Sequence, residues 1–131
     1  NIEFENKINK INKNIKIFYS KYKIKKIENF KNKKIVAFAG IGNPSNFFDL
    51  LKENNLNLKQ TFSFPDHHRY SDNDIKMLLA NSKNKILLTT EKDYSRLSNI
   101  SSINKSNIQY LKIELEIKNK DNFIELIKKY I

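Results

Sequence analysis

The sequence predicts an α/β fold: a three-layer α/β/α lobe with a mostly parallel sheet, preceded by a β-strand linker. Strand-like runs recur at residues 35–39, 58–64 and 86–89. A segment with helical spacing of apolar residues follows each run, and such alternation favours parallel strands with crossover helices. The chain has 131 residues, the length of about one domain.

The chain before residue 34 is expected to contain two segments. Residues 1–14 form a polar lead-in rich in Lys and Asn, which is either solvated or the tail of a missing upstream element, and we assign neither helix nor strand to it. Residues 15–33 form a basic β linker, because apolar residues alternate with Lys along 15–19 and 22–24. A change of parity near Ser20 predicts a bulge or turn there, and residues 29–34 form a polar connector.

The α/β lobe is expected to span residues 34–131. Residues 35–39 are a continuous apolar run, typical of a strand covered on both faces. A helix follows from about residue 45 to 54, and residues 58–64 form the next strand. Ser71 then opens a helix, with Asp74 at capping-box spacing. The helix residues expected to face the core are Phe47, Phe48 and Leu51, then Ile75, Leu78 and Leu79.

The second half of the lobe continues this pattern. Residues 86–89 form a third buried strand, a short helix runs to about residue 97, and residues 98–107 form a Ser/Asn loop. Strict alternation along 111–117 predicts one half-exposed strand at or near a sheet edge. The last helix spans about 120–130 and is expected to bury Phe123, Ile124, Ile127 and Tyr130.

Composition and charge exclude several classes of protein. There is no Cys, so disulfide frameworks and thiolate zinc sites are excluded, and no apolar run is long enough for a membrane span. The start lacks the apolar region of a signal peptide, and a chain beginning at Asn1 suggests a piece of something longer. Lys, Asn and Ile make up nearly half of the residues, which we interpret as genomic drift. The net charge of +11, of which +8 lies in residues 1–34, is therefore weak support for a nucleic-acid partner.

The rarest residue types gather in two short loops. Both glycines and one proline lie in 40–44, and the other proline and both histidines lie in 65–68. Each loop follows a predicted strand, and open parallel sheets bind ligands beyond the carboxyl ends of their strands. The two loops therefore predict a site at that edge of the sheet.

The first loop contains Gly40, Gly42 and Asn43. Glycine permits positive φ and close backbone approach, and the helix that follows offers free N–H groups to an anion. The loop has neither the Gly-Lys-Thr/Ser of a Walker A motif nor the third glycine of a dinucleotide fingerprint. A tight strand-to-helix turn is the alternative interpretation.

The second loop places Asp66 directly before His67. A neighbouring carboxylate can orient an imidazole and raise its pKa, which suits proton transfer near neutral pH. His68, Arg69 and Tyr70 complete this loop. We expect no metal, because the sequence has no further His or Cys to complete a site. The alternative is a surface turn capped by the aspartate.

A third segment comprises Thr90, Glu91, Lys92 and Asp93. Thr90 and Asp93 have the spacing of a helix cap, while Glu91 and Lys92 could reach a ligand phosphate or hydroxyl from the same crevice.

The aromatic and basic residues at 18–23 could stack on single-stranded nucleic acid, but strand faces with Tyr inward and Lys outward explain them as well, and we favour that interpretation.

Three motifs in order resemble a known family. They are residues 37–44 with Phe47 and Phe48, residues 64–70, and residues 88–93 with Arg96 and Leu97. Their order and spacing resemble the C-terminal domain of the tetraacyldisaccharide 4'-kinase family, the lipid A 4'-kinases.

The resemblance implies a kinase that transfers the ATP γ-phosphate to the 4'-hydroxyl of a tetraacyl-disaccharide 1-phosphate, a lipid A precursor. The implied fold is a P-loop-type lobe and a smaller C-terminal lobe joined by a short β linker, at the cytoplasmic face of the bacterial inner membrane. The implied partners are the lipid A disaccharide precursor, the N-terminal P-loop kinase lobe and an anionic membrane surface, with no nucleic acid. His67 corresponds to a histidine that pairs with the catalytic aspartate of the other lobe, and Asp66 shares the catalytic motif. The implied substrate-binding residues are Gly40, Gly42, Asn43, His68, Arg69, Tyr70, Thr90, Glu91, Lys92 and Asp93.

The chain departs from the family in one large respect. It has no Walker A Gly-Lys-Thr/Ser, so we expect ATP and Mg²⁺ to be bound by an N-terminal lobe missing from this chain. The chain alone is then expected to be inactive. The alternatives are a basic anion-binding module for nucleic acid or anionic lipid, whose affinity would fall steeply with salt, and an α/β remnant without activity.

Overall fold

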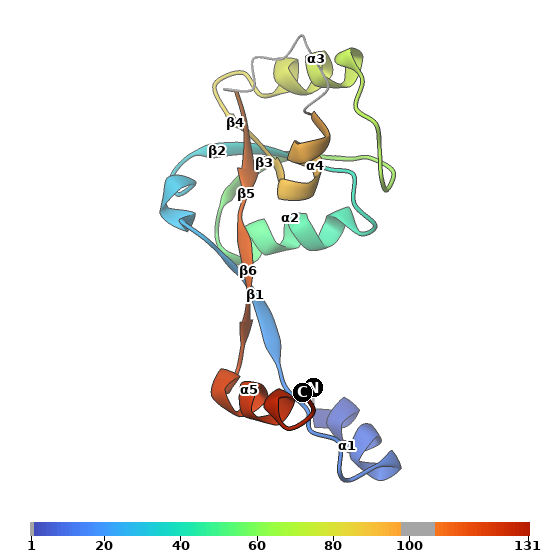
Figure 1. Cartoon of the computed structure of the whole chain (residues 1–131). Helices are drawn as coiled ribbons and strands as arrows, with labels where there is room; N and C mark the ends of the chain where they lie inside the picture. Colours follow the sequence, from blue (N-terminus) through green and yellow to red (C-terminus); the bar gives the residue numbers. More distant parts are fainter. Residues whose placement is uncertain (1, 98–106) are drawn as a thin grey trace. The chain divides into compact units, whose positions relative to one another are not determined.

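The computed structural model describes residues 2–97 and 107–131 and contains two compact units. The central unit is Ile24–Ile113, and the terminal unit combines Asn1–Lys23 with Glu114–Ile131 (Figure 1). This division differs from the expected one, in which a linker at 15–33 preceded a lobe at 34–131. The two ends of the chain share a unit because strands from both of them pair with each other.

The central unit is built on a parallel sheet of four strands in the order β3-β2-β4-β5 (Figure 1). This confirms the predicted α/β class. The strands are β2 (Lys34–Ala39), β3 (Asn57–Ser63), β4 (Ile86–Thr90) and β5 (Ile108–Leu111). The helices are α2 (Pro44–Glu53), α3 (Asp72–Asn81) and α4 (Glu91–Arg96).

Helices cover both faces of this sheet, so the three-layer prediction is also confirmed. Successive side chains of a strand point to opposite faces. Ile35 and Ala37 of β2 therefore pack with α2, and Val36 and Phe38 pack with α3 and with the end of α4. The helix residues that complete these two layers are Phe47, Phe48 and Leu51 of α2, Ile75 and Leu78 of α3, and Leu97 after α4.

Adjacent strands β2 and β4 send their following helices to opposite faces. The two connections therefore diverge at the carboxyl edge of the sheet, which is the place where open α/β sheets bind ligands. The loops at 40–43 and 64–71 lie at this edge, as does the start of α4. The topology thus places the two predicted loops at one edge of the sheet.

The predicted strand at 111–117 was wrong as a single element. β5 ends at Leu111, and a separate strand β6 (Ile113–Ile117) pairs with β1 (Ser20–Ile24) in a two-stranded sheet. The chain changes partner at Lys112, whose carbonyl accepts a hydrogen bond from the Lys25 amide at 2.8 Å. Alternation continues through the change and therefore does not reveal it. Residues 98–106 of the predicted Ser/Asn loop lie outside the described part of the chain.

The terminal unit differs most from expectation. Residues 2–11 form helix α1 (Ile2–Ile11), where we assigned no element, and an i,i+4 ion pair between Glu3 and Lys7 (2.9 Å) joins two of its turns. Residues 15–19 are not a strand, and Ile27–Asn29 of the expected linker form a 3-10 turn. The last helix, α5 (Lys120–Lys128), is present, but it buries none of the side chains that we expected it to bury. Within 2–97 and 107–131, no helix is long and apolar enough to cross a membrane.

Helix α3 begins with the predicted capping box. The Ser71 hydroxyl accepts a hydrogen bond from the Asp74 amide at 3.2 Å, and the Asp74 carboxylate accepts one from the Ser71 amide at 2.8 Å. The Ser71 backbone N–H is the largest influence that lowers the pKa of Asp74, and hydrogen bonds from the Ser71 hydroxyl and His68 lower it further. The ionised carboxylate therefore stabilises the start of the helix.

Replacing Asp74 with asparagine should lower the free energy of unfolding by about 1 kcal/mol at pH 7. A carboxyl pKa that is lowered on folding contributes stability above its unfolded value of about 3.9, and this contribution is lost as the pH falls through the lower folded value. Urea unfolding at pH 7 and pH 2.5 checks this. A difference between wild type and Asp74→Asn that is equally large at both pH values would contradict it.

Candidate functional site at the sheet edge

One arginine joins the three predicted site segments. The Arg96 guanidinium donates from Nη1 to the Gly40 carbonyl (2.8 Å) and to Oδ1 of Asp93 (3.2 Å), while Nη2 lies 3.1 Å from Nδ1 of His67. The His67 amide also donates to the Gly40 carbonyl at 3.2 Å. The structure therefore brings the Gly40 loop, the His67 loop and the start of α4 together.

Arg96 determines which ring nitrogen of His67 carries the proton. A guanidinium has only donors, so Nδ1 of His67 must accept the hydrogen bond and be unprotonated. The proton of the neutral ring then lies on Nε2. The ring is 71% exposed, so Nε2–H is open to an acceptor from outside this chain. His67 is thus prepared to donate a hydrogen bond to a carboxylate.

The Asp66 carboxylate interacts with the backbone of His67 more closely than with its imidazole ring. Its Oδ1 accepts the His67 amide at 2.9 Å, while its Oδ2 is 3.7 Å from Nε2, beyond hydrogen-bond distance. His67 has a left-handed backbone, with φ of 58°. The Asp66 carboxylate supports that turn, which also carries the His67 amide toward Gly40.

The buried Asp93 side chain connects the second loop with the start of α4. Its carboxylate is fully buried and accepts hydrogen bonds from Tyr70 Oη (3.1 Å), Thr90 Oγ1 (2.7 Å) and Arg96 Nη1 (3.2 Å). The Thr90 hydroxyl accepts the Asp93 amide at 3.0 Å, which is the predicted helix cap. Asp93 and Tyr70 were expected to bind substrate, but both side chains are buried and bonded internally. Their structural role is to fix Arg96 and the loops.

Burial is the main cause that raises the pKa of Tyr70, and the neighbouring Asp93 carboxylate raises it further. The phenol therefore stays protonated at every physiological pH and continues to donate to Asp93. Its ring makes edge-on contacts with Phe38, Phe64 and His68. Tyr70 thus ties the second loop to the core.

The remaining predicted residues divide between exposed positions and positions engaged by the scaffold. His68 stacks on Phe64, and its Nε2 lies 3.1 Å from Asp74 Oδ2, so its ring is engaged by α3. Besides Asp66 and His67, the exposed residues of the predicted set are Gly42, Asn43, Arg69, Glu91 and Lys92. Among residues 2–97 and 107–131, no three His, Asp or Glu side chains gather as a metal ion would require.

The two glycines have different requirements. Neither has a positive φ, so conformational freedom is not the reason for either. A Cβ on Gly40 would lie 3.0 Å from Tyr70 Oη and 3.2 Å from both the His68 Cβ and the Pro65 carbonyl. A Cβ on Gly42 would make an ordinary contact, 3.5 Å from Asp66 Oδ2. Gly40 is therefore needed because the second loop packs directly on it.

Gly40→Ala should destabilise the central unit by about 1–3 kcal/mol, because the added methyl group pushes on a backbone carbonyl and a buried phenol. Gly42→Ala is the matched control and should change stability by less than about 0.5 kcal/mol. Chemical denaturation of both variants checks this. Equal stability of the two variants would show that the loops do not need their close approach.

The residue that sequence reasoning missed is Arg96. It appeared only as part of the third motif and was not assigned to the site. One signal could have found it, since Arg occurs twice in a chain with 23 Lys. A guanidinium offers five donors in a planar fork, which a Lys ammonium does not, and Arg96 uses that fork to reach three acceptors.

Comparison with known proteins identifies the family. The family model for tetraacyldisaccharide-1-P 4'-kinase matches residues 3–131. The chain belongs to the tetraacyldisaccharide-1-P 4'-kinase family. A tetraacyldisaccharide 4'-kinase from Pelagibacter ubique is 39% identical over 131 residues, covering 97% of this chain and 41% of the relative. Two relatives of the same name also match. The one from Rickettsia bellii is 42% identical over 101 residues, covering 76% of this chain and 30% of the relative. The one from Bartonella quintana is 48% identical over 67 residues, covering 50% of this chain and 20% of the relative.

A solved structure of a member of the tetraacyldisaccharide-1-P 4'-kinase family supports the fold. LpxK from Aquifex aeolicus, crystallised in complex with ATP, matches with a TM-score of 0.58 and 21% identity, over 92% of this chain and 40% of that chain. The chain thus spans about two fifths of the length of these relatives, or less.

Proposed function

We propose that this chain is the C-terminal portion of a tetraacyldisaccharide 4'-kinase, which transfers the ATP γ-phosphate to the 4'-hydroxyl of a tetraacyl-disaccharide 1-phosphate in lipid A biosynthesis. Family membership supports the reaction. The role of this portion is supported by the contacts that Arg96 makes with the Gly40 carbonyl and with Nδ1 of His67. These contacts leave Nε2–H of His67 available at the carboxyl edge of the sheet.

His67 acts by orienting a carboxylate on the other lobe. Phosphoryl transfer needs a group that accepts the proton of the attacking hydroxyl, and an aspartate is a common choice. A hydrogen bond from His67 Nε2 to one oxygen of that aspartate leaves the other oxygen for the hydroxyl. Arg96 keeps Nδ1 as the acceptor, so the imidazole cannot turn its unprotonated nitrogen toward the carboxylate without losing the Arg96 bond.

ATP and Mg²⁺ belong to the other portion of the enzyme in this proposal. The sequence carries no Walker A motif, and the described residues hold no cluster of acidic side chains suited to Mg²⁺. The residues of this chain therefore do not fit a binding site for ATP or for Mg²⁺, and in this proposal they act on neither group. When bound, the metal neutralises charge on the transferring phosphoryl group.

The substrate and the membrane define the remaining partners. We assign the exposed Gly42, Asn43, Arg69, Glu91 and Lys92 to contact with the lipid A disaccharide precursor. The enzyme works at the cytoplasmic face of the bacterial inner membrane as a peripheral protein, and the +8 charge of residues 1–34 favours an anionic surface.

A chimera tests this function. The matched segment of the Pelagibacter ubique relative is replaced by this chain, and transfer of labelled γ-phosphate to tetraacyldisaccharide 1-phosphate is measured. The chimera should phosphorylate the 4'-hydroxyl, and the 131-residue chain alone should not. A chimera that folds, as judged by a cooperative melting transition, yet transfers no phosphate would refute the proposal.

A further inference from the structure

The terminal unit contains a cavity to which the proposed reaction assigns no ligand. Its volume is about 390 Å³, within the range of about 300–1,000 Å³ that is usual for small-molecule sites. One wall is α5 with the residues just before it, and the other is the segment 16–19 that follows α1. Both walls belong to the terminal unit, whereas the candidate site belongs to the central unit. The cavity is therefore a separate feature of the fold.

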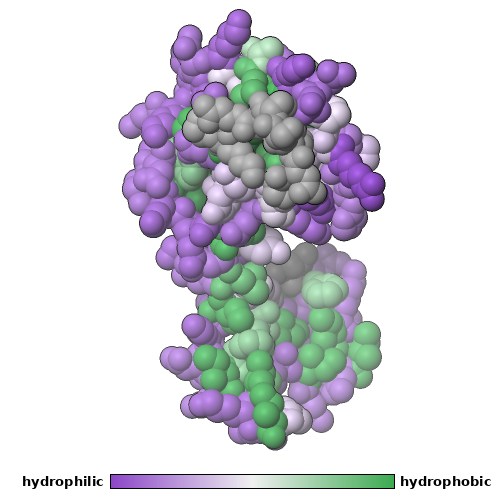
Figure 2. All heavy atoms as spheres, turned by 45° about the horizontal axis from the view of Figure 1, so that its top comes forward, coloured by the Kyte–Doolittle hydropathy of each residue, from purple (hydrophilic) through white to green (hydrophobic). Residues whose placement is uncertain are grey.

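Part of the lining of this cavity is apolar. Ile17 and Phe18 contribute from the segment after α1, and Leu126 contributes from α5. All three side chains are half-buried, and an edge-on ring contact at 5.2 Å between Phe18 and Phe123 joins the two walls. Figure 2 shows further apolar side chains at the surface of this unit, in the lower part of the view. Such a lining favours a ligand with a hydrocarbon part, because burying its surface removes apolar area from water.

The rest of the lining is polar and mainly cationic. Three lysines and one carboxylate, Glu125, give it a net charge of +2, and two asparagine side chains add amide N–H donors. A positive lining raises the local concentration of anions. The lysines are Lys16, Lys118 and Lys129, and the asparagines are Asn119 and Asn122.

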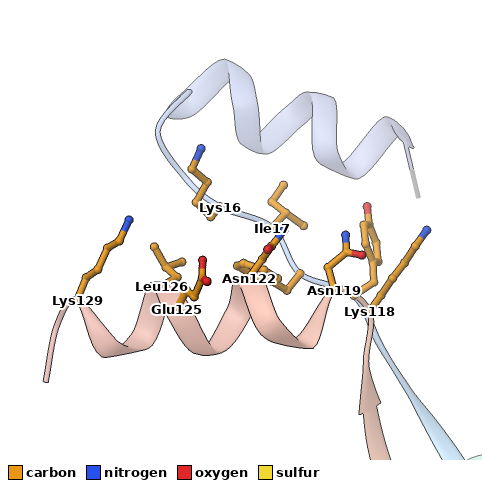
Figure 3. A pocket seen from close by; sticks show the side chains of 10 residues that line it. Lys16, Ile17, Lys118, Asn119, Asn122, Glu125, Leu126 and Lys129 are labelled. Atoms are coloured by element: carbon orange, nitrogen blue, oxygen red, sulfur yellow. The ribbon is translucent and has the colours of Figure 1, made fainter.

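Figure 3 shows how the two kinds of group are distributed. Lys16 and Lys129 lie toward one end of the hollow, and Ile17 and Leu126 lie next to them on opposite walls. Asn122, Leu126 and Lys129 share one face of α5, because residues three and four apart are neighbours on a helix surface. An anion held by the two lysines would therefore place an attached chain over Ile17 and Leu126.

We propose that this cavity binds a single-chain anionic amphiphile, in which an alkyl or acyl chain ends in a phosphate or a carboxylate. Lys16 and Lys129 contact the anion, while Ile17, Phe18 and Leu126 contact the chain. Both parts of the ligand are needed. Exposed lysines bind an anion weakly and in a salt-dependent way, whereas each buried methylene group raises affinity by up to about 4-fold. The proposal is independent of the proposed function, because it concerns binding in the terminal unit.

Titration of the 131-residue chain with decyl phosphate and with decanoate, below their micellar concentrations, tests the site. We expect saturable shifts of the amide NMR signals of residues 16–19 and 118–129, and the tighter of the two probes identifies the head group. Hexyl phosphate should bind about 10-fold or more weakly, because it is four methylene groups shorter. Inorganic phosphate lacks the chain and decyl maltoside lacks the charge. Binding of either one as tightly as decyl phosphate would overturn the proposal.

Two matched pairs of variants on α5 distinguish the cavity from the surface around it. Lys129→Glu and Leu126→Ala change residues that line it, whereas Lys128→Glu and Ile127→Ala make the same changes at adjacent residues that do not. The first two should weaken decyl phosphate binding by about 3-fold or more, and their controls by less than about 2-fold. Lys129 is exposed, so its variant keeps the test valid if Leu126→Ala unfolds α5. Equal losses in Lys128→Glu and Lys129→Glu would show binding to a basic surface and overturn the proposal.

The chimera described above shows whether the cavity is open in the larger protein. Decyl phosphate should bind it about as tightly as it binds the chain alone. A chimera that does not bind would overturn the proposal, because another part of the polypeptide then covers the cavity. Vesicles of phosphatidylethanolamine and phosphatidylglycerol that shift the same signals, where monomeric decyl phosphate does not, would overturn it in favour of a membrane surface. A chimera that binds decyl phosphate but transfers no phosphate would refute the proposed function and leave the site intact.

Discussion

Replacing His67 with asparagine should lower kcat of the chimera by about 100-fold, the lower end of the range for a lost proton-transfer group. The reason is that asparagine cannot place a donor where Nε2–H of the imidazole lies, so the carboxylate on the other lobe loses its orientation. Stability should change by less than about 0.5 kcal/mol, because the His67 side chain is 71% exposed and asparagine tolerates a left-handed backbone. Steady-state kinetics and thermal unfolding of the same preparation check both statements.

His68→Gln is the control for this prediction. It changes the neighbouring histidine, whose ring is engaged by Asp74 and Phe64. We expect kcat to stay within a few-fold of the unmodified chimera. Arg96→Lys should act like a partial His67 substitution, because a lysine cannot reach Gly40, Asp93 and His67 together. An unchanged kcat in His67→Asn would show that this histidine does not take part.

Asp93→Ala should lower the free energy of unfolding of the central unit by about 3–5 kcal/mol. The substitution leaves the Tyr70 hydroxyl, the Thr90 hydroxyl and one Arg96 nitrogen without their buried acceptor. Each unsatisfied buried group costs about 1–3 kcal/mol, and the helix cap at Thr90 also loses the side chain to which it donates. Equilibrium unfolding in urea, followed by far-UV circular dichroism, measures the loss.

Asp66→Asn serves as the matched control for this substitution. Asp66 is also a carboxylate at the candidate site, but its side chain is 47% exposed and supports only the turn at His67. We expect a stability change within about 0.5 kcal/mol. If Asp93→Ala costs no more than Asp66→Asn, the buried carboxylate does not organise the loops, and the scaffold role assigned to it here is wrong.

The central sheet could be predicted because its strands carry strong local signals. Residues 35–39 are apolar without interruption and residues 86–88 are apolar up to Thr89, a pattern typical of strands covered on both faces. The capping pairs Ser71 with Asp74 and Thr90 with Asp93 marked two helix starts that the structure confirms. These signals act within a few residues of chain, so they do not depend on distant partners.

The sequence indicated which loops to consider for a site, but not how their side chains are connected. The contrast between rare residues and a Lys-, Asn- and Ile-rich background drew attention to Gly40 and His67. Arg96 lies 56 residues from Gly40 and 29 from His67, so no local pattern connects them. The same holds for Tyr70 and Asp93, which the family resemblance implied as substrate contacts and which the fold buries together.

The terminal unit shows where local pattern is insufficient. The alternation along 111–117 is consistent with one strand, yet the chain leaves one sheet and enters another at Lys112. The apolar spacing of α5 predicted a buried face, and this prediction was wrong for the described residues. Ile124 and Ile127 are exposed because burial of a helix face requires a second surface, and the described residues do not cover these two side chains.

The sequence by itself determined the α/β class, the order of the central strands and helices along the chain, and the two loops rich in rare residues, because periodicity and caps are local properties. Only the tertiary structure decided the strand order, the pairing of the chain's two ends, and the tautomer of His67. Each of these features depends on interactions between groups that are distant in sequence. Those interactions contribute free energy only after packing and hydrogen bonding have brought the groups together.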